Sequence, residues 1–174
     1  AAWVAAAGPP PPSGDLLWPV DGGRFWRGWG SVRSISRTKR GAIRRGGRRR
    51  HHEGVDIGAA IGTPILAAND GLVVYSWNGM SGYGNVVAIV HGDGSLTMYA
   101  HCSATFVIPG QLVRRGQVIA AVGETGRAHG PHLHFELRID GESHDPEPLF
   151  AGRPDAPAAA SSASRNRSRP AMIC

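Results

Sequence analysis

The stretch His132-Leu133-His134-Phe135-Glu136-Leu137-Arg138 alternates strictly between polar and apolar residues. Successive side chains of a β-strand point to opposite faces, so its apolar residues would share one face and its polar residues the other. At a rise of about 3.3 Å per residue, His132 and His134 would lie about 7 Å apart on the polar face. The stretch therefore predicts a strand with the core on one side and a pair of histidines on the other.

Short apolar runs of the same kind precede this stretch, and turn signals such as Asn78-Gly79 and Pro109-Gly110 separate them. Together with the stretch itself they are Val55–Ile57, Pro64–Ala67, Gly71–Trp77, Asn85–His91, Leu96–His101, Gln117–Val122 and Leu133–Ile139. No clear amphipathic helix lies among them. The pattern predicts a mostly β fold, a single compact antiparallel β-sheet domain, which is closed or folded over on itself.

The ends of the chain have a different composition from this central part. A chain of 174 residues suits one domain with tails. We expect an Ala/Pro-rich leader or linker at 1–14, the folded domain at 15–150 and a disordered tail at 151–174. Ala5 to Ala7 could end a signal sequence, although a simple flexible leader explains these residues equally well.

The positive charge is concentrated outside the predicted strands. The chain carries a net charge of +6, and eleven of its 19 Lys and Arg lie between Arg24 and Arg50. We expect a basic loop around 33–50 that either binds an anionic polymer or is simply solvated. It lacks interleaved aromatic residues, so nucleic acid is not an expected partner. No apolar run is long enough for a transmembrane segment.

A second polar run, His52-Glu53-Gly54-Val55-Asp56, offers further candidates for a metal site. Asp56 would point away from its two apolar neighbours, and His52 would share its face if the chain stays extended. In the same way Thr97, Tyr99 and His101 would share one face of their strand.

These polar residues have the composition of a catalytic zinc site. Neutral imidazoles and one carboxylate suit Zn²⁺, and three protein ligands leave a position for water. Spacing alone does not decide whether His132 or His134 is the ligand. The remaining histidines are His51, His91, His129 and His144, and we expect them to be ordinary surface or core residues. This expectation carries a reservation for His51 and His129, because they adjoin the motifs.

Several blocks resemble, in consistent order, the lysostaphin-type (LytM-like) zinc metallopeptidases, which cut peptide bonds in bacterial peptidoglycan. The blocks are His52–Asp56, Thr97–His101, Gly123–Arg127 and Gly130–Glu136, with supporting ones at Gly62–Ile65, Asp70–Val73, Gly82–Asn85, His91–Gly94 and Gly116–Gln117. The resemblance covers roughly residues 16–150. It implies a compact antiparallel β fold with a narrow substrate groove.

The resemblance also divides the candidates by role. It implies one Zn²⁺ ion held by His52, Asp56 and His134, and an unliganded catalytic pair, His101 and His132. One histidine of the pair would act as general base on a zinc-activated water. Which histidine acts as the base stays open.

Other residues receive weaker assignments. Tyr99, Asn85 and His129 are expected in the substrate groove, although Tyr99 could equally belong to the core. Glu136 and Arg138 either support the metal site or face solvent.

The implied activity is hydrolysis of a peptide crosslink or stem peptide of peptidoglycan by a protein of the periplasm or the cell exterior. That location assumes an export signal at the N-terminus or upstream of it. The alternative is a non-catalytic relative that binds peptidoglycan or activates an amidase. Such relatives typically lack metal ligands, whereas this sequence fills every ligand position.

Overall fold

A computed structural model describes residues 16–32, 35–37, 43–45 and 50–151. The predicted leader at 1–14 lies outside the described residues, and so does the predicted tail after Ala151. The predicted antiparallel β fold is confirmed, since nearly all regular structure is strand and the described residues contain only one short 3₁₀-helix, Glu147–Leu149. None of the helical structure in the described part is long and apolar enough to cross a membrane.

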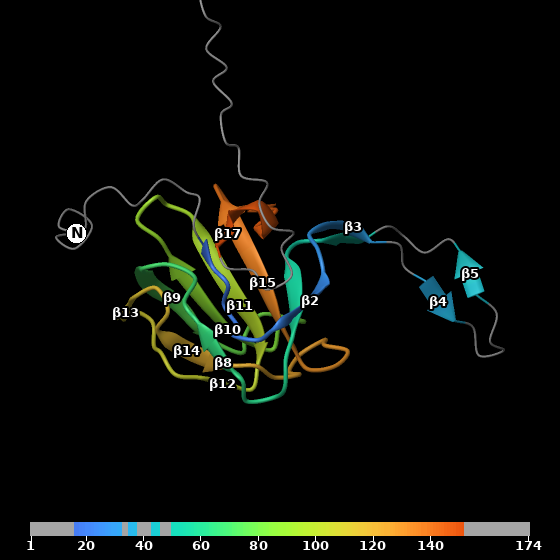
Figure 1. The fold of residues 1–174 in the computed structure, drawn as a ribbon, viewed down its shortest axis with the longest axis horizontal. Helices are drawn as coiled ribbons and strands as arrows, with labels where there is room; N and C mark the ends of the chain where they lie inside the picture. The colour runs from blue at the N-terminus through green and yellow to red at the C-terminus, as the bar shows by residue number, and fades with distance from the viewer. Residues whose placement is uncertain (1–15, 33–34, 38–42, 46–49, 152–174) are drawn as a thin grey trace, which may run out of the picture.

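A large antiparallel sheet forms the body of the molecule (Figure 1). Its strands in spatial order are β13 (Leu112–Val113), β9 (Gly71–Trp77), β10 (Asn85–Val90), β11 (Leu96–Cys102), β15 (His132–Ile139), β7 (Val55–Gly58) and β2 (Arg24–Arg27), with β16 (Glu142–His144) also paired to β15. The predicted strand over the His132 stretch is therefore a central strand of this sheet.

Smaller sheets complete the fold. Three short strands form a second antiparallel sheet, and they are β12 (Ala104–Thr105), β14 (Val118–Ala121) and β8 (Pro64–Leu66). Near the ends of the described domain, β1 (Leu16–Leu17) pairs in parallel with β17 (Phe150–Ala151). The strands thus divide between sheets, a division that the spacing of the apolar runs did not reveal.

The predicted basic loop differs from expectation in the parts that are described. The segment contains two antiparallel pairs, β3 (Gly30–Val32) with β6 (Arg50–His52) and β4 (Ile35–Arg37) with β5 (Ile43–Arg45). Because β6 is followed directly by β7, the first pair lies where the chain enters the large sheet, beside its edge strand β2.

The main core lies on one face of the large sheet. From β15 it receives the alternate apolar residues Leu133, Phe135 and Leu137, as predicted. It also contains residues of the small sheet, among them Ile65 and Ile119. Burial of apolar surface at roughly 25 cal/mol per Å² makes this contact between the two sheets the main source of stability.

The opposite face of the central strands carries both a small apolar cluster and the polar residues. The apolar cluster contains Val86, Ala88, Met98 and Ala100. In the strand register, Ala100 pairs with His134 and Met98 pairs with Glu136. The histidines of β15 therefore lie on the face opposite the main core, next to this small cluster.

Candidate metal and active site

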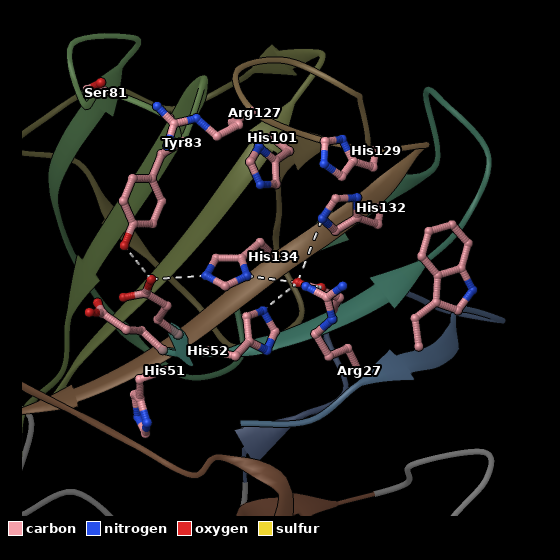
Figure 2. A pocket seen from close by; sticks show the side chains of 15 residues that line it. Arg27, His51, His52, Ser81, Tyr83, His101, Arg127, His129, His132 and His134 are labelled. Atoms are coloured by element: carbon pink, nitrogen blue, oxygen red, sulfur yellow. Dashed lines mark hydrogen bonds and ion pairs between the residues drawn. The ribbon is translucent and has the colours of Figure 1, made fainter. Parts of the chain in front are cut away.

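A groove of about 520 Å³ lies over this polar face of β7 and β15 (Figure 2). Figure 2 shows His52, His101, His132 and His134 pointing into the same space. The residues that line the groove are Trp26, Arg27, His51, His52, Glu53, Asp56, Ser81, Gly82, Tyr83, His101, Arg127, His129, His132, His134 and Glu136. The volume lies in the range of ordinary ligand pockets.

The strand register places Asp56 beside His134. The two residues are direct partners across the antiparallel pair β7–β15, whose directly opposed side chains approach to about 5 Å at Cβ. His134 Nδ1 lies 2.8 Å from Asp56 Oδ1. Their neighbours Val55 and Phe135 point into the main core, so a slip of one residue would bury the carboxylate among apolar side chains.

His52 reaches the same carboxylate oxygen from the end of β6. Its Nε2 lies 3.1 Å from Asp56 Oδ1, and its side chain is only 10% exposed. The chain between them needs Gly54, because a Cβ there would lie 2.2 Å from the backbone oxygen of Phe135. The ligand atoms of His52, Asp56 and His134 all lie within 4.8 Å of one another.

Hydrogen bonds on the outer ring nitrogens suit these residues to a metal ion. His52 Nδ1 donates to the carbonyl oxygen of Gly28 at 2.7 Å, which leaves a lone pair on Nε2. His134 Nε2 lies 3.0 Å from Glu136 Oε1, and donation there leaves a lone pair on Nδ1. Two imidazole nitrogens and a carboxylate oxygen form a donor set that fits Zn²⁺. This group of residues can therefore hold a metal ion.

The charges of the site are strongly coupled when no ion is bound. Burial opposes ionisation of Asp56, but its hydrogen bonds with His134 and His52 outweigh burial and lower its pKa well below the usual range. Burial would lower the pKa of His134, but the hydrogen bonds with Asp56 and Glu136 raise that pKa above its ordinary value. A metal ion at Nδ1 of His134 would replace a proton there.

The other two histidines lie next to this group. The ring centroids of His101 and His132 are 4.8 Å apart, and His132 Nε2 lies 3.7 Å from Asp56 Oδ1. His101 Nδ1 donates to the carbonyl oxygen of Thr125 at 2.7 Å, and His132 Nδ1 donates to that of Gly130 at 2.8 Å. Both rings thus keep Nε2 as a proton acceptor. Burial lowers the pKa of His101 to about 4, so this ring is neutral at neutral pH.

The position of His101 depends on an irregularity in β11. Between the pairs Val87–Tyr99 and Asn85–Cys102 the register shifts, so that β11 uses one residue more than β10. His101 has φ = 62°, a left-handed conformation uncommon outside glycine. This β-bulge turns the His101 side chain into the groove. The prediction that His101 shares a face with Tyr99 is therefore wrong, because the bulge interrupts the alternation.

Tyr99 lies in the main core and not in the groove. It has no exposed surface, and its hydroxyl accepts a hydrogen bond from the backbone N–H of Ala68. Asn85 is also absent from the groove lining, because its amide donates to the carbonyl oxygen of Cys102 at 2.9 Å. The groove assignments of both residues are corrected accordingly. His129 is among the residues that line the groove.

Glu136 supports the site from a fully buried position. Tyr83 donates its hydroxyl hydrogen to Glu136 Oε1 at 2.6 Å, and Arg138 Nε donates to Oε2 at 2.8 Å. Burial opposes ionisation of Glu136, but hydrogen bonds with His134, Tyr83 and Arg138 lower its pKa. Glu136 therefore links Tyr83 in the groove wall to His134, a candidate metal ligand. Arg138 also donates a hydrogen bond to Glu53.

The remaining histidines differ in their surroundings. His51 is exposed and lines the groove, with its ring 4.6 Å from that of Trp29. His91 is buried, with Nδ1 2.7 Å from the Asp70 carbonyl oxygen and Nε2 2.8 Å from Thr97 Oγ1. His144 is exposed on β16 and is not among the residues that line the groove.

Sequence reasoning missed several residues of the groove wall, notably Trp26, Arg27 and Arg127. Trp26 is 54% exposed, and its ring centroid lies 5.9 Å from that of His132. The Trp26 ring fits there because residue 58 is glycine, where a Cβ would lie 1.9 Å from a ring atom. These residues come from loops and an outer strand, where no alternation distinguishes a groove residue from a solvated one.

Residues 50–146 match the family "Peptidase family M23". The match includes every candidate ligand and both further histidines. The chain belongs to this peptidase family. The lysostaphin-type resemblance inferred from the sequence blocks is thereby confirmed.

Curated relatives include proteins that are named as enzymes and as an activator. The chain is 44% identical over 106 residues to the DD-carboxypeptidase/endopeptidase Mpg of Neisseria meningitidis, covering 61% of this chain and 24% of the relative. It is 43% identical over 95 residues to the Murein hydrolase activator NlpD of Escherichia coli, covering 55% and 25%. The chain thus spans about a quarter of the length of these relatives.

Solved structures share the fold. A structure described as a zinc containing peptidase from Vibrio cholerae superimposes with a TM-score of 0.61 at 34% identity, covering 77% of this chain and 39% of the other. The catalytic domain of lysostaphin from Staphylococcus simulans superimposes with a TM-score of 0.59 at 30% identity, covering 74% and 92%. This fold is therefore one on which a zinc peptidase site has been observed.

Proposed function

We propose that this protein is a zinc-dependent endopeptidase that hydrolyses peptide bonds in bacterial peptidoglycan. The observation that carries the proposal is the convergence of His52, Asp56 and His134 in one groove with two further histidines. Membership of the M23 peptidases and similarity to the enzyme Mpg support the reaction and the substrate class.

In this proposal His52, Asp56 and His134 hold one Zn²⁺ ion. When bound, zinc lowers the pKa of a water molecule and polarises a carbonyl group. The carbonyl of Gly28 and the carboxylate of Glu136 orient the two imidazole ligands through their outer nitrogens. The strand pair β7–β15 holds Asp56 opposite His134 before any ligand arrives.

His101 and His132 supply the acid–base chemistry. Each donates its Nδ1 hydrogen to a backbone carbonyl, so each offers Nε2 to the groove. One of the two takes the proton of the attacking water, and the other stabilises the developing oxyanion or protonates the leaving amine. The two rings are close enough to act on one scissile bond.

A second candidate is a role as a non-catalytic partner that activates a murein hydrolase. The similarity to NlpD favours it. Against it stands the full set of polar residues, since an activator needs neither metal ligands nor two further histidines in its groove. Turnover distinguishes the two candidates.

The test uses purified peptidoglycan and the purified chain. The metal is removed with a chelator, one equivalent of zinc is restored, and released fragments are identified by mass spectrometry. The proposal predicts new peptide termini with zinc and none after chelation. A protein that keeps stoichiometric zinc, cuts nothing and stimulates an added amidase would establish the second candidate instead.

The proposed substrate also places the protein in the cell envelope, as its relatives' names suggest. The basic segment 33–50 would hold it there on anionic polymers through its many arginines. Retention on anionic wall polymer, measured with the intact chain at low and high salt, checks this part. Retention that is equal at both salt concentrations would contradict it.

A further inference from the structure

The charged residues that line the groove differ in whether they have partners. Asp56 has His52, His134 and Arg27 within reach. Arg27 in turn lies 3.6 Å from Asp56 Oδ2, so part of its charge is already compensated. The charge of the Asp56 carboxylate is therefore balanced within the protein.

The glutamates of the groove are compensated in the same way. Arg138 binds both Glu53 and Glu136, and Glu136 also has hydrogen bonds with Tyr83 and His134. Neither carboxylate therefore requires a cation from a ligand.

Arg127 differs from these residues. It lines the groove, yet among the described residues its guanidinium has no ion pair and no hydrogen bond. Two arginines line the groove, Arg27 and Arg127. Arg27 lies beside Asp56, whereas Arg127 has no carboxylate partner among the described residues. Figure 2 shows its side chain on the wall of the pocket with His101 and Tyr83.

The backbone at Arg127 is held firmly. The N–H of Arg127 donates to the carbonyl oxygen of Gly82 at 2.8 Å. The two loops meet backbone to backbone, because a Cβ at Gly126 would lie 2.4 Å from the nitrogen of Gly84, and a Cβ at Gly84 would lie 2.7 Å from the nitrogen of Gly126. Because the backbone is already fixed, the loop loses little additional entropy when the Arg127 side chain binds a ligand.

We propose that Arg127 binds a free carboxylate of the substrate close to the scissile bond. The inference rests on the proposed function and makes its substrate class more specific, namely peptides that carry an anionic group next to the cleaved bond. A planar guanidinium matches a carboxylate with two parallel hydrogen bonds, a geometry that a lysine ammonium does not reproduce. Replacing that carboxylate by its amide removes the charge and one acceptor oxygen.

The experiment compares two crosslinked muropeptides, one with free stem carboxylates and one with the same groups amidated. Hydrolysis of each by the zinc-loaded chain is followed for the wild type and for the Arg127→Gln, Arg127→Lys and Arg114→Gln variants. Arg114 is the matched control, since it is exposed and does not line the groove. Zinc content is measured for every variant and is expected to equal that of the wild type.

The expected result is a preference of the wild type for the carboxylate substrate by about tenfold in kcat/KM, the scale of a charge-assisted hydrogen bond at an accessible site. Arg127→Gln removes this preference through a higher KM on the carboxylate substrate, with no change on the amide. Arg127→Lys restores only part of it, and Arg114→Gln changes neither substrate. Equal losses on both substrates, or a wild type without preference, would overturn the inference.

A binding measurement separates this inference from the proposed function. If the zinc-loaded wild type cuts neither substrate, the proposed function fails, and titration calorimetry with the same muropeptides decides the inference. Tighter binding of the carboxylate form by the wild type, lost in Arg127→Gln, supports it. Equal binding of both forms, or no binding at all, contradicts it.

Discussion

The two halves of the groove are built in different ways. Asp56 and His134 are direct partners in the register of the neighbouring strands β7 and β15, and the apolar residues that alternate with them along each strand anchor that register in the main core. His101 owes its position to a β-bulge, and both His101 and His132 are oriented by single hydrogen bonds to loop carbonyls. The metal half, Asp56 and His134, is therefore fixed by the strand register, whereas in the loop half, His101 and His132, the ring orientation depends on carbonyls of the loop 123–131.

The comparison implies that metal binding and hydrolysis can be separated by mutation. A change in the metal half should remove both. A change in the loop half should remove hydrolysis and leave the metal in place.

The largest effect is expected for His134→Ala. This variant loses a ligand nitrogen, so zinc affinity should fall by more than the roughly 10- to 100-fold typical of residues that only support a ligand. Hydrolysis should fall to the background rate. Zinc per chain after dialysis, measured by mass spectrometry, checks the first effect, and His144→Ala on exposed β16 is the control. A full zinc equivalent in His134→Ala would refute the metal assignment.

Gly123→Ala probes the loop half. A Cβ at residue 123 would lie 2.3 Å from the nitrogen of Ser103 and 2.7 Å from the oxygen of His101, so the bulge must shift. A displacement of about 1 Å costs on the order of 100-fold in rate, and we expect a loss of that size with zinc retained. Gly141→Ala, where a Cβ meets nothing within 4 Å and φ is 83°, controls for a glycine replacement that strains the backbone without touching the bulge. Unchanged hydrolysis in a folded Gly123→Ala protein would show that the bulge does not position His101.

These two halves also differ in how well the sequence predicted them. Alternation placed Asp56 on the polar face of β7 and His134 on the polar face of β15, because regular strands obey a period of two. That these two faces meet was implied only by the family resemblance. The same rule failed in β11, where an added residue reverses the face of His101 and leaves Tyr99 in the core. A bulge at a non-glycine residue has no local sequence signal, so its position emerges only with the paired strands.

Long-range contacts account for the other differences between the predicted site and the structure. The sequence did not decide whether Glu136 faces solvent or supports the metal site. In the structure it is buried and hydrogen-bonded to Tyr83 and Arg138. Trp26 and Arg127 belong to the groove because of how β2 and the loop 123–131 fold over it. Composition and spacing carry no information on such contacts.

A smaller effect is expected for Glu136→Gln. The variant keeps the shape of the side chain but weakens the hydrogen bond that orients His134, so zinc affinity should fall by about 10- to 100-fold. Hydrolysis at saturating zinc should change less. A competition titration with a chelating dye measures the affinity, and Glu53→Gln is the matched control because Arg138 binds both residues. Equal zinc affinities in the two variants would contradict a supporting role for Glu136.

The smallest effect concerns stability and lies away from the groove. Burial lowers the pKa of His91 below its ordinary value of 6.5, so the unfolded chain binds the proton more tightly than the folded one. Its contribution to the free energy of unfolding is therefore present above pH 6.5 and is lost as the pH falls below it. Urea unfolding of the wild type and His91→Gln across pH 5 to 8 should show their difference shrinking toward pH 5, whereas a constant difference would refute the linkage.

The central claim is that one zinc ion is held by His52, Asp56 and His134 while His132 acts beside it on a peptide bond. The most direct test measures zinc stoichiometry and hydrolysis of purified peptidoglycan on the same preparation of His132→Ala. The account predicts one zinc per chain, as in the wild type, with hydrolysis reduced by about 100- to 10,000-fold, the usual contribution of a general acid or base. Loss of zinc from this variant, or hydrolysis at the wild-type rate, would contradict it.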